Sequence, residues 1–377
     1  MIILQISPEF GTGTGVGGVA EALEDRWLAL GHDVRRFGPE EAGCGPLSSL
    51  GPGLRGRIRL ASRVVWFSSV GTIRARRVIR DLPPGAVTVC HNDALAGDVY
   101  INHGLLATAM RARGRFFWRM VRNPLHLFTS VRDAYRYRAG VHRVVVNLSE
   151  ADRQSLIHQY GLSPQEVVVI PNGVHLDRYS PTSPAERAEA RRALGIPEGV
   201  RVAVFVGHEY DRKGLQFLLG ALPGLPDHHA VVVGGTAEQV RRGRKGLAPH
   251  LASRVHWLGR LPDPRQALSA SDVLVLPSAY EANPLVVLEA LAAGLQVVAT
   301  PVGSVPELLA NDEVSKIVER TSEGVCGGLA ALAAADVAPE EVRRRARSIA
   351  ETMSWDIVAA KYLELFDQMD SKDDLSR

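Results

Sequence analysis

Short runs of apolar, β-branched residues alternate with longer stretches of helical periodicity along the whole chain. Apolar runs without polar alternation are typical of strands buried on both faces, and such strands form parallel sheets covered by helices. Helical patterns fill most of the intervals between these runs, for example at 18–31 and 150–161. The sequence therefore predicts an α/β protein. The predicted strands lie at 1–6, 33–37, 86–90, 99–102, 143–147, 166–170, 200–207, 229–235, 254–259, 272–277 and 296–300.

The alternation restarts near residue 200, after an interval rich in proline and alanine at 181–200. A chain of 377 residues is also longer than one hydrophobic core usually serves. We therefore expect two Rossmann-like parallel-sheet domains, with 181–200 as the linker region. Ligands of open parallel sheets bind beyond the carboxyl ends of the strands, so the active site is expected in a cleft that both domains face.

The composition is that of an ordinary soluble globular protein, with 46% hydrophobic and 23% charged residues. No apolar run approaches the roughly 20 residues of a membrane-spanning helix, and the first residues lack the basic segment of a signal peptide. The three cysteines, Cys44, Cys90 and Cys326, form no C-x-x-C pair, which favours a reducing compartment and no zinc site. The sequence therefore predicts a cytoplasmic protein.

Positive charge is unevenly distributed, although the net charge is only +3. Eight arginines and no acidic residue lie at 42–80, and eight more arginines lie at 110–138 with one acid, Asp133. Arginines and aromatic side chains on different faces suit the surface of an anionic membrane, whereas a solvated basic surface over buried aromatics is the alternative. Nucleic-acid binding is not favoured, because no recognition motif accompanies the charge. The aromatic residues of the second segment are Phe116, Phe117, Trp118 and Phe128.

The stretch YEANPLVVLEALAAG at 280–294 carries two glutamates, Glu281 and Glu289. Pro284 suits the first turn of a helix, which we expect to run from about 284 to 293 and to end at Gly294. A fully helical stretch would separate the carboxylates by about 12 Å, more than the roughly 5 to 9.5 Å of a glycosidase pair. The free N–H groups at the start of the helix favour an anion that lies between the two carboxylates. The stretch can therefore hold an extended ligand, whereas an isolated E-x7-E is usually a surface glutamate and a capping acid.

Two cations, Arg212 and Lys213, follow the predicted strand at 200–207 and precede a helical pattern. Cations at the start of a helix are unfavourable unless an anion lies beside them. The pattern therefore predicts a phosphate-binding loop, with solvent-facing side chains as the alternative.

A glycine-rich segment, GTGTGVGG at 11–18, follows the first strand and precedes a helix. Gly13, Gly15 and Gly18 have the G-x-G-x-x-G spacing of a dinucleotide-binding loop. A nicotinamide-dependent oxidoreductase is therefore an alternative, although no later segment is typical of a dehydrogenase substrate domain.

The stretch at 280–309 resembles the E-x7-E signature of the retaining glycosyltransferases of family 4 (glycosyltransferase group 1). Four more segments are similar to that family in the same order, at 167–181, 203–222, 255–278 and 353–369, so the resemblance covers most of the chain. It implies the GT-B fold, with an acceptor-binding domain at 1–178, a donor-binding domain at 179–354 and a C-terminal helix, 355–377, that crosses back to the first domain.

The resemblance also implies roles for residues of the second domain. Glu281 is expected to contact hydroxyls of the donor sugar, and Glu289 to hold the ribose. Lys213 matches the phosphate-binding lysine of the family. His208 stands where an arginine is frequent in the family, so Arg212 is expected to supply the first cation. The backbone amides expected at the distal phosphate lie around Asn283, Leu285 and Val286, because Pro284 has none.

In the first domain, Gly17 and Gly18 match a glycine pair that faces the donor phosphates in the family. His103, at the end of a predicted strand, is the best match to a histidine that points at the reacting sugar. His91, at the end of the preceding strand, is the competing candidate. Its neighbour Cys90 is expected in the core rather than as a nucleophile.

The implied reaction moves a hexose from a nucleotide-diphosphate donor to a hydroxyl acceptor with retention, and a lipid-linked or cell-envelope glycan fits the basic first domain. The chain contains no D-x-D, the motif that metal-dependent transferases of another fold use, so we expect no metal and no cofactor. A sugar-nucleotide epimerase or phosphorylase of the same fold stays open. The sequence does not predict the base, the donor sugar or the acceptor.

Overall fold

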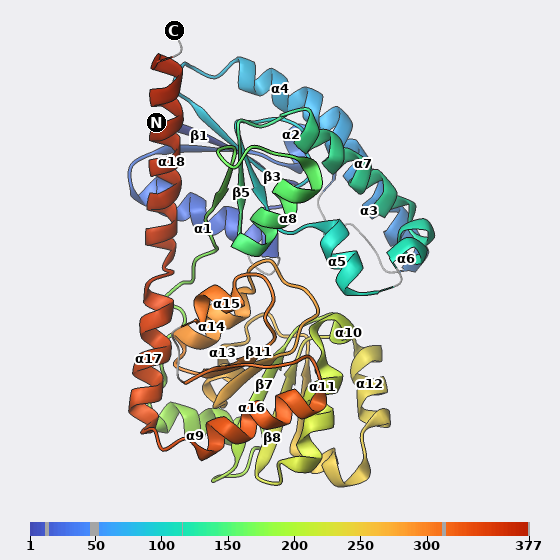
Figure 1. The fold of residues 1–377 in the computed structure, drawn as a ribbon, viewed down its shortest axis with the longest axis vertical. Helices are drawn as coiled ribbons and strands as arrows, with labels where there is room; N and C mark the ends of the chain where they lie inside the picture. The colour runs from blue at the N-terminus through green and yellow to red at the C-terminus, as the bar shows by residue number, and fades with distance from the viewer. Residues whose placement is uncertain (12–14, 46–52, 115, 311–313, 376–377) are drawn as a thin grey trace. The chain divides into compact units, whose positions relative to one another are not determined.

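The computed structural model describes residues 1–11, 15–45, 53–114, 116–310 and 314–375 (Figure 1). Contacts divide the chain into two compact units, the first being Met1–Asn172 with Trp355–Arg377 and the second Gly173–Ser354. The structure thus changes units at 172, whereas the boundary expected from the sequence lies at 178. Each unit contains one six-stranded sheet whose strands all pair in parallel.

The sheet of the first unit has the strand order β2-β1-β3-β4-β5-β6, and each of its strands was predicted. Alternate side chains of β1 face two different layers of helices. Leu4 and Ile6 belong to a hydrophobic cluster with Phe67, whereas the Gln5 amide donates to Ala20 O of the helix that follows β1, at 3.0 Å. Burial on both faces explains why the inner strands are largely apolar, whereas the edge strand β2 is polar and mostly exposed. The strands are β1 (Ile2–Ile6), β2 (Asp33–Phe37), β3 (Val87–His91), β4 (Val99–Asn102), β5 (Val144–Asn147) and β6 (Val167–Val169).

The C-terminal helix α18 (Trp355–Leu375) returns to the first unit and packs against α1 (Gly15–Ala29), shown in red and blue in Figure 1. The Trp27 indole donates to Ala359 O at 3.3 Å, and its ring lies 5.7 Å from that of Phe366. The expected return of this helix is therefore confirmed. The other α-helices of this unit are α2 (Pro39–Ala42), α3 (Gly53–Trp66), α4 (Thr72–Arg80), α5 (Leu106–Ala112), α6 (Phe116–Arg122), α7 (Pro124–Arg138) and α8 (Glu150–Tyr160), and the π-helix η2 (Phe67–Gly71) joins α3 to α4.

The sheet of the second unit has the strand order β12-β11-β10-β7-β8-β9. Five of its strands were predicted, and the sixth, β12 (Lys316–Ile317), is an edge strand of two residues that gives no periodic signal. The central strand β10 is completely apolar and buried, and the interior of its neighbour β7 is as well, so this sheet too is covered on both faces. The predicted strands are β7 (Arg201–Val206), β8 (His228–Val233), β9 (Val255–Gly259), β10 (Val273–Leu276) and β11 (Gln296–Ala299).

The interval expected to be a linker, 181–200, instead contains helix α9 (Pro184–Ala193) inside the second unit. The Ser183 hydroxyl accepts from the Glu186 N–H, and Pro184 occupies the first turn, where its missing N–H is no loss. The proline therefore starts a capped helix rather than marking a flexible segment. The other α-helices of the unit are α10 (Tyr210–Lys213), α11 (Leu215–Ala221), α12 (Ala237–Gly246), α13 (Arg265–Ser269), α14 (Leu285–Ala292), α15 (Val305–Leu308), α16 (Ser322–Ala334) and α17 (Pro339–Glu351), with 3₁₀ turns at η3 (Leu222–Gly224) and η4 (Pro249–Arg254).

Candidate active site

The loop after β10 carries Glu281 and leads into α14, six of whose eight residues are buried. Pro284 precedes the helix in extended backbone (φ −75°, ψ 103°) rather than forming its first turn, so α14 is one residue shorter at each end than expected. Helix amides of the first turn have no acceptor within the helix. The N–H groups of Leu285 and Val286, directly after the proline, therefore belong to the free amides at the start of α14.

A second loop holds the Glu281 loop in place. The Ser304 N–H donates to Ala282 O at 3.0 Å, and the Asn283 amide donates to Ser304 Oγ at 2.5 Å. A Cβ on Gly303, whose φ is +53°, would lie 2.1 Å from Ala282 O and 2.3 Å from Glu281 O. Only glycine allows this approach. Gly303 and Ser304 could not be identified from the sequence, because their partners lie about twenty residues away in the chain.

Glu281 gathers the two predicted cations on one carboxylate oxygen. Lys213 Nζ lies 2.9 Å and Arg212 Nη1 3.1 Å from Glu281 Oε1, and the Ser278 hydroxyl donates to the same oxygen at 2.9 Å. Arg212 also donates to Tyr280 O at 2.5 Å. These contacts join two segments of the second unit, 212–213 after β7 and 278–281 after β10, so the pairing of β7 with β10 brings the cluster together.

The positions of the cations follow from the one-turn helix α10 and its glycines. Arg212 and Lys213 form the last residues of α10, and Gly214 ends it in the left-handed region (φ +79°). The two cations thus directly precede α11, whose N-cap is Gly214, as the sequence predicted, and they also form the end of the one-turn helix α10. A Cβ on Gly207 would lie 2.2 Å from the Lys213 side chain, so this glycine makes room for the lysine beside β7.

The electrostatics of Glu281 favour its charged form. Burial alone would raise its pKa, but Lys213 and Arg212 outweigh burial and hold the pKa below its usual value. Glu281 is thus a fixed negative charge at the end of β10. A lysine ammonium has three donors, and Lys213 uses one of them on Glu281 among the described residues. The remaining donors of Lys213 are available to an anion.

Glu289 lies inside α14 and is held differently. Burial raises the pKa of its carboxyl group, and a hydrogen bond from the Tyr179 hydroxyl opposes this shift only in part. Tyr179 follows β6 in the chain and is buried in the core of the second unit. This partner could not be identified from the sequence, since Tyr179 lies 110 residues from Glu289 in the chain and no local pattern links the two.

A cavity of about 830 Å³ lies where β7, β8 and β9 end. His208 borders it, and its ring Nδ1 accepts from the Gly235 N–H at 3.3 Å. Partial burial, with Arg260 and Lys213, lowers the pKa of His208, which is therefore neutral at pH 7. The volume is that of a pocket for a small organic ligand. Its other lining residues include Thr236, Gln239, Arg244, Trp257, Leu258 and Gly259.

In the first unit the two competing histidines, His91 and His103, contact each other. His91 Nδ1 lies 3.1 Å from His103 Nε2, and His91 Nε2 lies 2.9 Å from Gln5 Oε1. The Gln5 amide nitrogen donates to the carbonyl of Ala20, so Gln5 Oε1 must accept from His91 Nε2–H. His91 Nδ1 is then an acceptor, and His103 donates to it through Nε2–H.

Both histidines are neutral at pH 7. Burial lowers the pKa of His103 to about 4, and burial together with His103 lowers the pKa of His91 well below its usual value. The fixed tautomer leaves His103 Nδ1 as the atom with a free lone pair. His91 and Gln5 thus orient His103, and Gln5 was not identified from the sequence because it looks like an ordinary strand residue.

The glycine-rich segment differs from the expected loop. Helix α1 already begins at Gly15, so Gly17 and Gly18 lie in its first turn, and Gly17 is buried. Gly13 lies outside the described residues. A Cβ on Gly18 would meet nothing within 4 Å, so packing does not demand a glycine there.

No group of three or more His, Cys, Asp or Glu side chains in the described ranges could hold a metal ion. None of the helices described is long and apolar enough to cross a membrane.

Two family models match the chain: "Glycosyltransferase Family 4" over residues 13–178 and "Glycosyl transferases group 1" over residues 200–334. D-inositol 3-phosphate glycosyltransferase of Corynebacterium glutamicum is 26% identical over an alignment of 315 residues that covers 75% of each chain. Alpha-maltose-1-phosphate synthase of Mycobacterium tuberculosis is 32% identical over 245 residues, 59% of this chain and 62% of the relative. Phosphatidyl-myo-inositol mannosyltransferase of the same species is 30% identical over 216 residues, 54% of each.

Solved structures show the same fold. The glycosyltransferase WaaG superimposes with a TM-score of 0.76 at 20% identity, over 97% of this chain and 99% of WaaG. HepE of Anabaena, solved with UDP-glucose, superimposes with a TM-score of 0.67 at 18% identity, over 97% of this chain and 99% of HepE. The fold is therefore GT-B and the protein is a glycosyltransferase. The chain belongs to glycosyltransferase family 4, group 1. Because the family 4 model includes the glycine-rich segment from residue 13, the oxidoreductase alternative loses its basis.

Proposed function

We propose that this enzyme transfers a hexosyl group from a nucleotide-diphosphate sugar to a hydroxyl acceptor, with retention at the anomeric carbon. The observation that carries the proposal is the cluster of Lys213, Arg212 and Glu281 directly before the amino-terminal end of α14. Fixed cations beside free helix amides suit a diphosphate leaving group, which gains charge as the glycosidic bond breaks.

The second unit offers a place for each part of such a donor. Lys213 and the first-turn amides of α14 would bind the diphosphate, while Glu281 would accept hydrogen bonds from sugar hydroxyls. Glu289, with Tyr179 behind it, would hold the ribose. The cavity bordered by His208 and Trp257 is large enough for the base. HepE, whose structure contains UDP-glucose, has the same fold and supports this class of donor.

The proposed reaction takes place on one face of the sugar. The bond between the anomeric carbon and the diphosphate oxygen breaks, and the acceptor oxygen bonds to that carbon on the same side. The diphosphate oxygen takes the proton of the incoming hydroxyl. Arg212 and Lys213 supply the positive charge that a divalent cation supplies elsewhere, so the reaction requires no metal. His103, oriented by His91, would contact the reacting sugar through Nδ1.

The acceptor is proposed to be a saccharide or a lipid-linked glycan, used at an anionic membrane surface on the cytoplasmic side. Helix α6 supports the membrane contact, because the side chains of Phe117, Trp118 and Val121 are 81%, 55% and 73% exposed. Arg122 lies over the Trp118 ring at 4.7 Å, so charge and aromatic surface are adjacent. This exposure favours the membrane interpretation over a fully buried aromatic stripe.

Two arginines of the basic segment 110–138 do not belong to this surface. Arg132 is buried and pairs with Asp93 at 2.6 Å and with Asp133 at 2.9 Å. Arg136 is 1% exposed, with its guanidinium 3.8 Å above the Tyr100 ring. The proposed membrane surface is therefore limited to α6.

The membrane surface of α6 is tested by sedimentation with vesicles of phosphatidylglycerol. The fraction of protein that sediments should fall sharply when Trp118 and Val121 are both changed to glutamate, whereas equal sedimentation would exclude this surface.

The reaction is tested by supplying UDP-, GDP- and ADP-hexoses with D-inositol 3-phosphate, maltose or a lipid-linked acceptor in EDTA. The expected result is release of one nucleoside diphosphate that depends on acceptor, with a product of the same anomeric configuration as the donor by NMR. Inversion would contradict the proposed stereochemistry. Turnover of the donor without any acceptor hydroxyl would instead identify an epimerase or phosphorylase of the same fold.

A further inference from the structure

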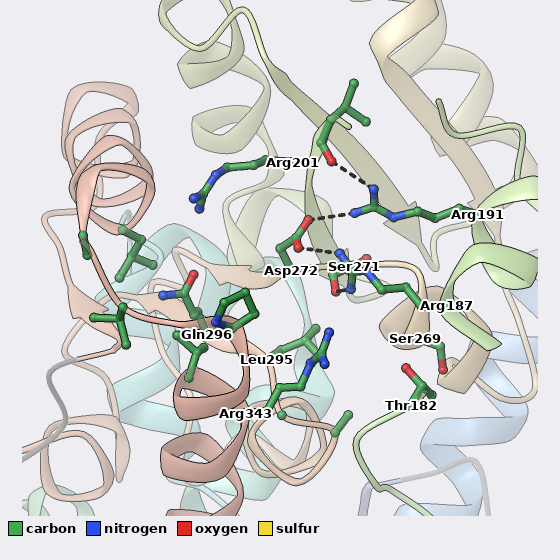
Figure 2. A pocket seen from close by; sticks show the side chains of 18 of the residues that line it. Thr182, Arg187, Arg191, Arg201, Ser269, Ser271, Asp272, Leu295, Gln296 and Arg343 are labelled. Carbon is green, nitrogen blue, oxygen red and sulfur yellow. Dashed lines mark hydrogen bonds and ion pairs between the residues drawn. The ribbon is translucent and has the colours of Figure 1, made fainter. Parts of the chain in front are cut away.

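A second polar cavity lies within the second unit, at the opposite edge of its sheet from the Glu281 loop (Figure 2). Its volume is about 310 Å³. Arg201 is the first residue of β7, Gln296 the first residue of β11, and Asp272 directly precedes β10. Parallel strands place these residues at the amino-terminal edge, whereas Glu281 follows the carboxyl end of β10. A ligand in this cavity would therefore lie away from the donor loop.

The cavity is lined by four arginines and one carboxylate. Asp272 is already fully engaged: it pairs with Arg187 and, at 2.9 Å, with Arg191, and it accepts the Val202 N–H at 2.8 Å. Figure 2 shows the contacts of Asp272 with Arg187 and Arg191 as dashed lines. One carboxylate thus neutralises part of the charge of two arginines, and these two side chains form the fixed wall of the cavity.

The other two arginines, Arg201 and Arg343, have no carboxylate partner among the described residues. Arg201 donates to Ala333 O at 3.3 Å, and Arg343 makes no hydrogen bond or ion pair in the part of the chain that the structure describes. The pKa of Arg187 reflects this excess of positive charge. Burial lowers that pKa, and Arg191 and Arg343 lower it further, although Asp272 raises it. A cavity with this excess of charge favours an anion.

The first turn of α17 also lines the cavity, through Pro339, Val342 and Arg343. This helix of 13 residues has Ala338 at its N-cap, which has no side chain that could bond the free amides. The positive end of the helix dipole therefore lies at the cavity, where Glu340 and Glu341 of the same turn offset part of its charge. Neutral hydrogen-bonding groups complete the lining, from Thr182, Ser269 and Gln296 (Figure 2).

We propose that this cavity binds the phosphate monoester of a small polyhydroxy compound, with Arg201 and Arg343 on the phosphate. Guanidinium groups bond two phosphate oxygens at once, and a helix start favours the same charge. The hydroxyl and amide groups of the lining suit the hydroxyls of the ligand. A volume of about 310 Å³ is at the lower limit of ligand pockets, which fits a glycerol or hexose phosphate better than a nucleotide sugar.

The test is calorimetric titration with glycerol 3-phosphate, carried out on Lys213→Met protein. This background weakens any phosphate site at the donor loop, so the result does not depend on the proposed function. The expected result is saturable binding of glycerol 3-phosphate and none of glycerol. Affinity should fall by about tenfold or more when either Arg343→Gln or Arg201→Gln is added, since each removes charge-assisted hydrogen bonds.

Arg344→Gln is the matched control, because Arg344 is the next residue of α17 but points to solvent and pairs with Glu341. It should leave the affinity unchanged. Thermal unfolding checks that each variant is folded, and Arg201→Gln provides a second measurement should Arg343→Gln not fold. The proposal is overturned if glycerol 3-phosphate does not bind, or if Arg344→Gln weakens binding as much as Arg343→Gln.

Discussion

Lys213 Nζ lies 2.9 Å from Glu281 Oε1, the oxygen that Arg212 also approaches at 3.1 Å. A residue expected to contact the donor sugar therefore also positions the two cations expected to bind its diphosphate. The charges of Glu281 and of a phosphate compete for the same donors. Binding of the diphosphate and catalysis should consequently respond in opposite directions to the loss of this carboxylate.

Glu281→Gln should lower kcat by about a hundredfold, because it removes a charged acceptor for the sugar hydroxyls in the transition state. Affinity for the nucleoside diphosphate should stay equal or increase, since Lys213 and Arg212 lose their competing partner. Steady-state kinetics and titration with the diphosphate measure the two effects separately. Glu323→Gln, an exposed change in the first turn of α16, is the control and should alter neither. A parallel loss of kcat and diphosphate affinity would contradict the assigned role of Glu281.

Glu281 and Glu289 should change the free energy of unfolding in opposite directions as the pH rises. The pKa of Glu289 is raised above its usual value of 4.5, so its contribution to the free energy of unfolding is lost as pH rises through the raised pKa. The pKa of Glu281 is lowered, so its contribution is present above 4.5 and is lost as pH falls through the lowered pKa.

Chemical unfolding from about pH 3 to about pH 7, the range in which carboxyl groups titrate, checks this prediction. The stability of wild type relative to Glu289→Gln should decrease with rising pH above 4.5, whereas that relative to Glu281→Gln should decrease with falling pH below 4.5. Two difference curves of the same slope would show that the two environments are not as different as the structure indicates.

His91→Phe should lower kcat without changing donor affinity, because His91 positions His103 and is proposed to touch no substrate. Phenylalanine keeps a ring beside His103 but removes the acceptor of its Nε2–H, so the ring loses its fixed orientation. A decrease of about tenfold or more is expected from the loss of one orienting hydrogen bond. Nitrogen NMR should show His103 with Nε2–H in wild type and a mixed tautomer in the variant.

The second unit contains a matched control pair. His229 Nδ1 lies 3.1 Å from His256 Nε2, and the rings have the same spacing, 5.4 Å, and the same interplanar angle, 22°, as those of His91 and His103. His229→Phe, the counterpart of His91→Phe, should leave kcat unchanged. An equal loss of kcat in both variants would mean that the effect is structural rather than positional.

The sequence predicted the fold well and the contacts of the site only in part, for a physical reason. Apolar runs are local signals, so most strands could be identified, and β12 was missed because two edge residues carry no period. The prediction of a linker at 181–200 was wrong because proline occurs both in irregular segments and in the first turn of helices, and Pro184 starts a helix. Lys213 and Glu281 could be named from their motifs, but their contact across 68 residues could not.

The partners that were missed share one property: each acts through a contact between distant segments. Tyr179 supports Glu289, Gln5 fixes the tautomer of His91, and Gly303 lets one loop approach another. Residue type and spacing do not encode such pairs, because the sheet order decides which loops meet. The buried Arg132 illustrates the same limit, since in the sequence it looks like part of a solvated basic surface.

The central claim is that the second unit binds a nucleoside diphosphate at Lys213 without metal. Calorimetric titration of UDP, GDP and ADP in EDTA tests it most directly, on wild type, Lys213→Met and the control Lys361→Met, an exposed change on α18. The account predicts binding of at least one diphosphate by wild type and by the control, and an affinity lower by about tenfold or more in Lys213→Met. Equal affinity in all three proteins, or binding only when magnesium is added, would contradict it.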